Sequence, residues 1–485
     1  MKILNIAICC ILALSMASCD DFLDVRPKAE KLERELFKDA KGFESAIYGV
    51  YGTLQKESLY GKDMLWGITE VLAQNLQSGS DMMSKLAKYD YESDADMKSM
   101  FAGVWGSAYQ TIGYANNILN QLENWSPASL PLYNYYKGEM LGVRALLHFD
   151  LLRLFAPIDE SKQGIPYVKT YNPVVKPFST VGEVYSQIIA DLIEAEGLLK
   201  EQESLIVYPR NDANYHRFLN YQETHFNLYA VRALLARVYW MKSQGKAGED
   251  LKKAGEYAES VIKSGKFPLV DRTEIKDYLA GTISPKETIF GIYSTSYQKT
   301  AETYLYNFNT YASFNPYKES SYDSYTKVYK KNVPAQSQDY RLDGHFTSSN
   351  EIVKCLKLVD VYAIENKVPA HRQNLITGVT LMHTSEMYLI AAEALLNTNK
   401  DLALKYFDDE ISSRGLSKLS QQDVTLTSEI IYNEYHKELY GEGQVWFNMK
   451  RLNRTIKSNA ESRDIPGNDK IYVLPIPEEE FEYRN

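Results

Sequence analysis

The residues best suited to contact a ligand gather in one tyrosine-rich stretch, residues 293–329. The chain contains 38 tyrosines against 5 tryptophans, and nine of the tyrosines fall in this stretch with few aliphatic residues among them. They cannot all belong to a core. A tyrosine ring is amphipathic and loses little entropy on ordering, which suits a binding loop. The candidate contacts are Tyr297, Tyr304, Tyr306, Tyr311 and Tyr317.

A second group of candidates lies between residues 60 and 98, where aromatic rings alternate with hydrogen-bonding side chains. The residues chosen are Trp66, Asn75, Asp81, Tyr89 and Tyr91. For every residue of either stretch, the competing interpretation is packing onto the rest of the protein. Three other tryptophans fall on strong helical stripes and are predicted to lie in the core, namely Trp105, Trp240 and Trp446.

The sequence carries no pattern typical of an enzyme. It lacks a His-Glu-x-x-His zinc motif, a Gly-x-Ser-x-Gly elbow, a phosphate-binding loop and a Cys-x-x-Cys pair. Its seven histidines show no ligand spacing and no EF-hand-type loop is present, so no metal or cofactor is assigned. The acidic runs at 408–410 and 478–480 are interpreted as solvated faces. We therefore expect a protein without catalytic activity.

The N-terminus has the layout of a lipoprotein signal peptide. Lys2 precedes an apolar run at residues 3–16, and the small pair Ala17-Ser18 leads directly into Cys19. The run is shorter than the roughly 20 apolar residues that span a bilayer, so a removed signal peptide, residues 1–18, is favoured. Cys19 is the predicted lipidation site, with an ordinary secretory cut beside an incidental cysteine as the alternative. Several acyl chains on one cysteine would anchor the protein firmly.

We expect the mature chain, residues 19–485, to form a single domain. Its composition limits which ligands it can bind and what can stabilise its fold. The formal net charge of the full sequence is −9, which argues against nucleic acid because that ligand needs a basic face. If Cys19 carries lipid, Cys355 has no disulfide partner. A large hydrophobic core must then hold the chain, and 45% hydrophobic residues are enough to form one.

Helices must position these candidates, because three-and-four spacing of apolar residues dominates residues 30–265 and 384–455. Two stretches, 224–264 and 385–414, are typical of helical hairpins with small residues at close-packing positions. Their length and composition indicate tetratricopeptide-type units, which stack and bury a shared core. Further helices are expected at 37–54, 101–122, 138–155, 184–198 and 428–452.

Residues 266–383 interrupt this pattern. Helical periodicity fades there, the tyrosines crowd together, and a short β-like run appears at 288–293. We predict an all-α fold, a scaffold of tetratricopeptide-like helix pairs, with 266–383 as a large loop-rich insertion lying across it. Residues 58–98 are expected to form a shorter helix with loops, exposed at one side of the bundle.

Five motifs, in this order and spacing, resemble one known family. They are CDDFLDVRP at 19–27, RALLHFDLLRLF at 144–155, ALLARVY at 233–239 with VIKSGKF at 261–267, YLIAAEA at 388–394 with SRGL at 413–416, and ELYGEGQVWFNMKR at 438–451 with LPIP at 474–477. Together they make the chain similar to the SusD/RagB family of outer-membrane, nutrient-binding lipoproteins. His148 and Asn448 depart from the family pattern, where an aromatic residue and an aspartate are expected.

The resemblance implies four tetratricopeptide-like helix pairs and a lipid-anchored position on the cell surface. It also implies a partner, a SusC-type TonB-dependent transporter on which such proteins sit as a lid. Similar proteins bind oligosaccharide, or in some branches peptide, without cleaving it. The acidic residues after the lipidated cysteine direct export to the surface in similar proteins, and Asp20, Asp21 and Asp24 fit that role.

A saccharide ligand matches the two candidate stretches. A sugar ring presents a flat C–H face and a rim of hydroxyls, which require an aromatic platform and polar side chains. The alternatives that stay open are a peptide ligand and a helical-repeat scaffold for protein interaction. A surface glycoside hydrolase is the weakest alternative, because it needs two carboxylates about 5–9 Å apart in a cleft.

Overall fold

The structure, a computed structural model, describes residues 28–210, 213–214, 216–271, 274–275, 281–309, 311–330, 339–349, 352–372 and 375–482. The expected signal peptide, Cys19 and the acidic residues that follow it lie outside these ranges. Within the described ranges, no helix combines the length and the apolar character needed to cross a membrane.

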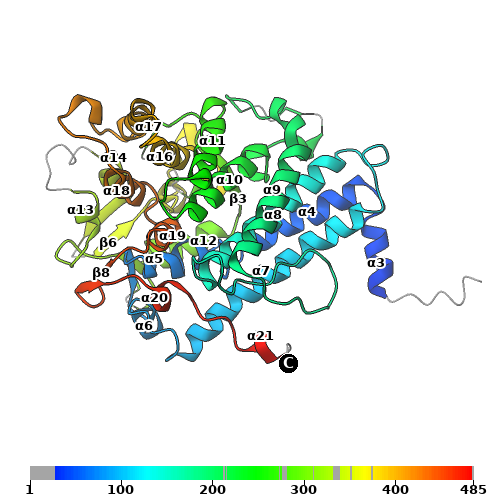
Figure 1. Ribbon diagram of the computed structural model, residues 1–485, viewed down its shortest axis with the longest axis horizontal. Helices are drawn as coiled ribbons and strands as arrows, with labels where there is room; N and C mark the ends of the chain where they lie inside the picture. Colours follow the sequence, from blue (N-terminus) through cyan, green and yellow to red (C-terminus); the bar gives the residue numbers. More distant parts are fainter. Residues whose placement is uncertain are drawn as a thin grey trace, which may run out of the picture.

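Helices form the N-terminal half of the scaffold where the apolar spacing predicts them (Figure 1). α4 (Ala40–Leu54) begins after Asp39, whose carboxylate accepts a hydrogen bond from the Gly42 amide, as expected at a helix N-terminus. Its buried residues recur at three-and-four spacing, so one face packs against the core. The other helices here are α3 (Lys28–Leu36), α7 (Ala95–Leu122), α8 (Tyr133–Phe155) and α9 (Val181–Leu199).

α8 is apolar on nearly every face and is buried along most of its length. Charged residues inside such a helix need partners, because an unpaired buried charge is costly. Arg144 forms a bidentate pair with Asp191 of α9, at 2.6 and 2.8 Å. Arg153 pairs with Asp150, which lies three residues and about one helical turn earlier on the same helix.

The two predicted hairpins are present and stack on each other. They are α10 (Leu228–Ser243) with α11 (Glu249–Lys263), and α16 (Thr384–Leu395) with α17 (Lys400–Ser413). α11 packs against α16, so the hairpins adjoin although the insertion separates them in sequence. Arg237 of α10 also reaches Glu386 of α16, with its Nη2 atom 2.6 Å from the carboxylate. The all-α scaffold of helix pairs is thereby confirmed.

The last predicted helix, 428–452, is divided in two: α18 (Ser428–Glu438) and α19 (Gln444–Arg451). Gly443 separates them with a positive φ of 75°, a conformation that favours glycine. A Cβ atom at this position would lie 2.4 Å from the Leu65 carbonyl oxygen, so only glycine fits this close approach.

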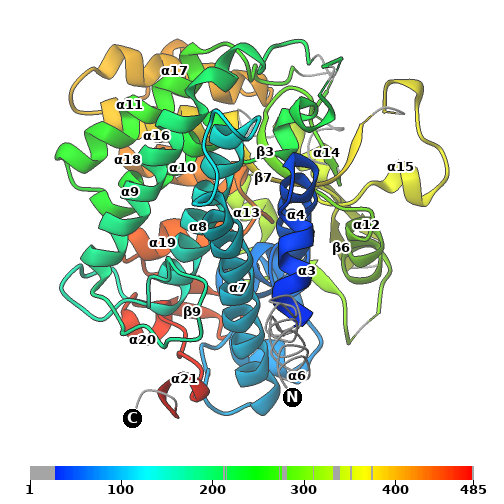
Figure 2. The ribbon, with the colours of Figure 1, turned by 90° about the vertical axis from the view of Figure 1, so that its right-hand side faces the viewer.

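The insertion contains short strands and short helices around one small antiparallel sheet. The strand order is β2 (Thr282–Ile283), β7 (Ile376–His383) and β3 (Thr288–Tyr293). β3 confirms the β-like run at 288–293, and Figure 2 shows β3 and β7 beside α4. The remaining elements are α12 (Tyr297–Ala301), the π-helical η5 (Glu302–Tyr306), β4 (Phe314–Pro316), α13 (Tyr325–Val328), α14 (Tyr340–His345), β5 (Phe346–Ser349), β6 (Ile352–Cys355), α15 (Val361–Ile364) and η6 (Ala370–Arg372).

Two expectations about exposure are wrong. Much of residues 59–76 is buried rather than exposed, because its apolar side chains face both the scaffold and the insertion. In the run 408–410, Asp408 accepts a hydrogen bond from the Leu419 amide at 2.6 Å, and Glu410 is fully buried.

Short elements also occur between α4 and α7 and near the C-terminus. They are η1 (Asp63–Gly67), α5 (Ile68–Leu72), β1 (Leu76–Ser78), α6 (Asp81–Leu86), β8 (Ile456–Ser458), β9 (Arg463–Ile465), α20 (Asp469–Tyr472) and α21 (Glu479–Glu482).

Candidate ligand-binding surface

The two stretches that supply the candidate residues meet in space. β1 pairs with β4 in an antiparallel ladder that sets Gln77 opposite Asn315. Beyond the ladder, the Ser78 hydroxyl donates a hydrogen bond to the Tyr311 carbonyl oxygen at 3.2 Å. These contacts join segments more than 200 residues apart in sequence. The end of β1 and the tyrosine-rich stretch therefore form one surface.

Trp66 lies inside the protein, beneath this surface. Its side chain has no solvent exposure, and its ring meets Phe314 edge-on with 5.3 Å between the ring centroids. Tyr304 packs against the same indole at 6.1 Å. Trp66 therefore supports the insertion from below, and in this conformation its face is not open to a ligand.

Three other candidates of the 60–98 stretch are also buried, with their polar atoms bonded internally. The Tyr89 hydroxyl donates to the Leu72 carbonyl at 3.1 Å, and its ring stacks on Trp446. The Tyr91 hydroxyl donates to the carbonyl of Ile471 at 2.5 Å. The Asn75 amide donates to Glu70 at 2.7 Å. Burial raises the pKa of both Tyr89 and Tyr91, so these phenols stay protonated.

Tyr297 and Tyr317, from the tyrosine-rich stretch, are buried as well. Burial raises the pKa of each phenol. Both side chains contribute to the contact between the insertion and the scaffold, and neither presents a ring face to solvent here.

The candidates that do reach solvent are Asp81, Tyr304, Tyr306 and Tyr311. Tyr311 is 62% exposed, and Phe308, which the sequence reasoning did not select as a ligand contact, is also exposed. Tyr304, Tyr306, Phe308 and Tyr311 lie close together in the sequence and are called the aromatic segment below. Lys354 stands over the Tyr306 ring, with its Nζ atom 4.5 Å from the centroid. The Tyr306 hydroxyl donates to Glu365 at 3.3 Å.

The aromatic segment and the end of β1 together offer the chemistry that a sugar requires. Exposed rings can stack on C–H faces, while Gln77 and Asp81, both exposed, can bond hydroxyls. Phe308 was not among the predicted contacts, because only tyrosines were selected in this stretch. Its position between Tyr306 and Tyr311 is the sequence feature that could have identified it.

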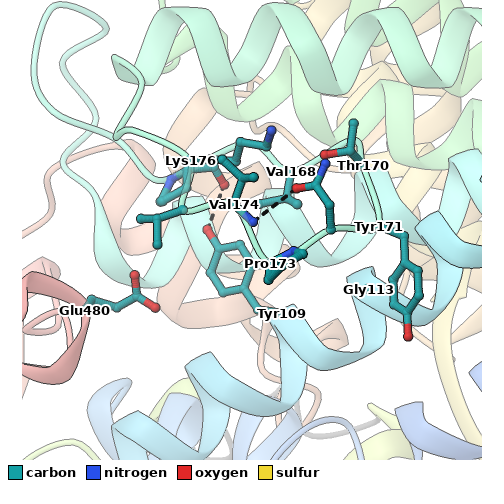
Figure 3. Close-up of a pocket in the computed structure, with 12 residues that line it drawn as sticks. Tyr109, Gly113, Val168, Thr170, Tyr171, Pro173, Val174, Lys176 and Glu480 are labelled. Carbon is teal, nitrogen blue, oxygen red and sulfur yellow. Dashed lines mark hydrogen bonds between the residues drawn. The ribbon is translucent and has the colours of Figure 1, made fainter. Parts of the chain in front are cut away.

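A separate pocket of about 610 Å³ lies beside the loop between α8 and α9 (Figure 3). Tyr109 of α7 closes one side, and its hydroxyl donates to the Pro166 carbonyl at 2.7 Å. Figure 3 shows Val174 and Lys176 of the loop above it and Glu480 at its edge. Its lining holds none of the candidate residues.

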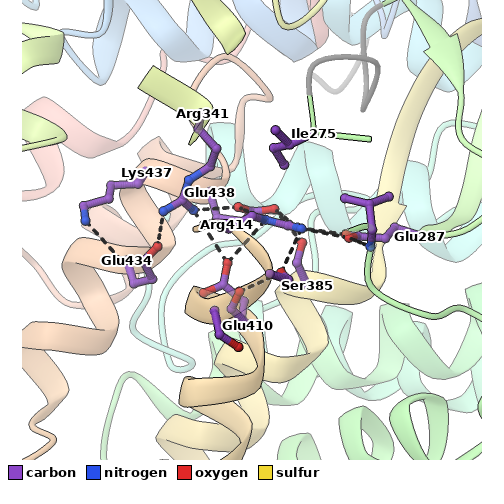
Figure 4. Close-up of polar contacts among 12 residues, drawn as sticks. Ile275, Glu287, Arg341, Ser385, Glu410, Arg414, Glu434, Lys437 and Glu438 are labelled. Atoms are coloured by element: carbon purple, nitrogen blue, oxygen red, sulfur yellow. Dashed lines mark hydrogen bonds and ion pairs between the residues drawn. The ribbon is translucent and has the colours of Figure 1, made fainter. Parts of the chain in front are cut away.

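A buried charge cluster lies between the insertion and helices α16–α18 (Figure 4). Arg414 bonds Glu287 of the insertion, at 2.9 Å from each carboxylate oxygen, and Glu438 at 2.6 Å. Glu287, Glu438 and His383 bring one potential metal-ligand atom each within 4.8 Å of one another. The Arg414 guanidinium already supplies the positive charge that these two carboxylates need, so the cluster fits an ion-pair network rather than a metal site.

The structure is a helical-repeat scaffold with an insertion that carries exposed aromatic rings. A family model described as "Starch-binding associating with outer membrane" matches residues 21–240. The model of the SusD family matches residues 201–482. The chain belongs to the SusD family.

Relatives match along almost the whole chain. "SusD-like protein P2" of Formosa agariphila is 24% identical over 96% of this chain and 95% of its own length. A SusD superfamily protein from Bacteroides thetaiotaomicron has a similar structure, with a TM-score of 0.73 and 22% identity over 92% of this chain and 98% of its own. A structure described as a laminarin binding SusD-like protein has a TM-score of 0.64 and 17% identity over 92% and 97%. These structural likenesses establish the shared fold.

Proposed function

We propose that this protein is a lipid-anchored protein of the outer cell surface that binds an oligosaccharide without cleaving it. It then delivers the glycan to a SusC-type TonB-dependent transporter. The observation that carries the proposal is the aromatic segment, whose exposed rings adjoin the polar end of β1. The family model's description as starch-binding and the laminarin-binding structural neighbour support a glycan as the ligand class.

Binding at this surface relies on stacking and hydrogen bonds, with no covalent step. An exposed tyrosine or phenylalanine loses little entropy when a sugar ring covers it, because its side chain has only two rotatable bonds. Each contact is weak, so the complex forms and dissociates readily. Reversible capture suits a protein that passes its ligand on.

Calorimetry and affinity electrophoresis of a soluble form lacking Cys19 test the binding, with starch and laminarin in the panel. Tyr311→Ala removes the most exposed candidate ring and should weaken glycan binding by about tenfold, equivalent to ~1.4 kcal/mol. Tyr171→Ala is the matched control, because Tyr171 is also exposed but lies on the α8–α9 loop. Equal affinity of the two variants, or no binding to any polysaccharide, overturns the proposal. Binding of peptides instead would identify a peptide-binding member.

The anchor at Cys19 is tested separately in cells that make the full chain. Cys19→Ala removes the predicted acylation site and should move the protein from the membrane fraction to the soluble fraction. Labelled palmitate should be incorporated by the unaltered chain alone. A variant that stays in the membrane fraction without label would contradict the lipoprotein assignment.

A further inference from the structure

A cleft of about 1040 Å³ opens between α4, the end of β3 and residues 217–224. Its lining contains no residue of the aromatic segment and none of β1. The cleft is therefore distinct from the surface described above, although the two are connected by one helical segment.

Three tyrosines from three different elements border this cleft. Tyr48 of α4 is 48% exposed, Tyr221 is 50% exposed, and Tyr293 at the end of β3 is 57% exposed. Single exposed apolar residues are ordinary on a protein surface, whereas several that border one cavity are typical of a binding site. A pocket of this volume is also in the range that holds an oligosaccharide-sized ligand.

The surrounding structure positions these tyrosines at the border of the cleft. The half-exposed Tyr48 ring packs against Phe218 at 5.7 Å and against His225 at 6.0 Å between centroids. Tyr293 stands opposite Gly378 in the β3–β7 ladder, and a glycine has no side chain to cover it. Tyr221 adopts a left-handed backbone conformation with φ of 54°, uncommon for a residue with a Cβ.

Polar side chains complete the lining of the cleft. Gln55, Asn220, Thr224 and Thr377 provide amide and hydroxyl groups, and Arg217 provides an exposed guanidinium. The Gln55 side-chain carbonyl accepts a hydrogen bond from the Ser296 hydroxyl at 3.4 Å. Aromatic faces bordered by amides, hydroxyls and an arginine match the C–H faces and hydroxyls of a saccharide.

We propose that this aromatic cleft is a second saccharide subsite. It rests on the proposed function, and adds that one glycan chain occupies the cleft and the aromatic segment together. Joining two weak sites through one ligand raises the overall affinity well above that of either site, because the second contact becomes intramolecular. The protein therefore selects long glycan chains over short ones.

The test uses laminarin and starch as polysaccharides, with laminaritriose and maltotriose as the short counterparts, in calorimetry on the soluble full-length mature chain. The variants are Tyr293→Ala and Tyr48→Ala in the cleft, Tyr311→Ala in the aromatic segment, and Tyr171→Ala as the exposed control. Each cleft variant should weaken polysaccharide binding at least about tenfold. Trisaccharide binding should fall less, because the aromatic segment still holds a short ligand.

The outcomes separate the two proposals. If the unaltered protein binds polysaccharide and only Tyr311→Ala weakens it, the second subsite is wrong and the proposed function stands. If no polysaccharide or trisaccharide binds the unaltered protein, both proposals fall. The thermal unfolding midpoints of Tyr48→Ala and Tyr293→Ala should match that of Tyr171→Ala. If one cleft variant has a much lower midpoint, the binding affinity of the other cleft variant decides whether the second subsite exists.

Discussion

Several buried tyrosines in this protein donate hydrogen bonds from their hydroxyls to buried acceptors. The Tyr51 hydroxyl donates to Glu139 and the Tyr60 hydroxyl to Asp150, each at 2.6 Å. Tyr440 donates to the Asn75 carbonyl, also at 2.6 Å. A tyrosine can thus fill apolar space and satisfy a buried acceptor at once. A high tyrosine content can therefore reflect packing, which explains why four of the five selected tyrosines of the insertion are buried or partly covered.

Trp66→Ala should reveal this packing role as lost stability. Removing a fully buried indole between Phe314 and Tyr304 leaves a cavity, and we expect the free energy of unfolding to fall by about 3–5 kcal/mol. Denaturant unfolding of the soluble form measures this change. Tyr311→Ala, at an exposed position, should change it by less than about 0.5 kcal/mol. A stable Trp66→Ala protein with weakened glycan binding would instead favour a ligand contact by Trp66.

The burial of a tryptophan can be predicted from the sequence where it lies on a regular helix, but not where the helical period is lost. Trp105, Trp240 and Trp446 lie on regular helices, so the 3.6-residue period correctly predicts their burial. Trp66 belongs to the short π-helical segment η1, in which the period is lost. Its burial depends on Phe314, a residue far away in the sequence, and no local pattern carries that information.

At the scale of elements, the buried charge cluster joins the insertion to the scaffold. Arg341 of α14 bonds Glu438 of α18 at 2.7 Å and also pairs with Glu434. The Glu410 carboxylate of α17 lies 3.6 Å from Arg341 and 3.7 Å from Arg414, and it accepts no hydrogen bond from the residues that the structure describes. Burial and the charges of Glu434 and Glu438 raise the pKa of Glu410 well above its usual value. Both causes disfavour the charged form of Glu410.

Two substitutions in this cluster should have opposite outcomes. Glu438→Gln removes a charge that compensates both Arg341 and Arg414, and we expect a loss of about 3–5 kcal/mol in the free energy of unfolding. Glu410→Gln removes a carboxylate whose charge is disfavoured by burial and by Glu434 and Glu438, and should cost no more than about 1 kcal/mol. Parallel denaturant unfolding at pH 7 measures both. Equal losses would contradict the different roles given to Glu438 and Glu410.

Acid should weaken the same cluster. Burial alone would raise the pKa of Glu438, but the charges of Arg414 and Arg341 outweigh it and hold this pKa well below its usual value. Its contribution to stability is thus fully present above the unfolded-state pKa of about 4.3 and is lost as the pH falls toward the folded-state pKa. Unfolding measured from pH 6 down to pH 3 should show the unaltered protein losing more stability than Glu438→Gln. Parallel curves would show that other carboxylates dominate.

The elements differ in how far local sequence determines them. The hairpins α10–α11 and α16–α17 follow from apolar spacing, and Asn227 and Asn399 cap α10 and α17 as N-cap residues. β1 and β4 are only three residues long and exist through mutual pairing across the chain. That pairing also positions the aromatic segment. The sequence therefore predicts which residue types form the candidate ligand-binding surface, but not which of them are exposed or how they are arranged.

Across the whole molecule, the C-terminal segment crosses back over the N-terminal helices. The Leu474 amide donates to the Leu154 carbonyl of α8 at 2.9 Å. The Trp105 indole of α7 donates to Glu480 at 2.9 Å, and Phe481 stacks on Phe178 with 5.6 Å between centroids. One connected group of buried apolar residues runs from Phe37 to Leu474 and includes residues of the scaffold and of the insertion.

This continuity predicts that the scaffold and the insertion unfold together. Their interface contains packed rings such as Trp66 against Phe314 and the buried pairs of Arg414, so the insertion has little core of its own to survive separately. Differential scanning calorimetry of the soluble form should show one transition whose calorimetric and van't Hoff enthalpies agree. Glu438→Gln should lower the midpoint of that transition without splitting it, because the charge cluster contacts both parts. A separate transition at lower temperature, strengthened in Glu438→Gln, would mean that the insertion unfolds as an independent unit.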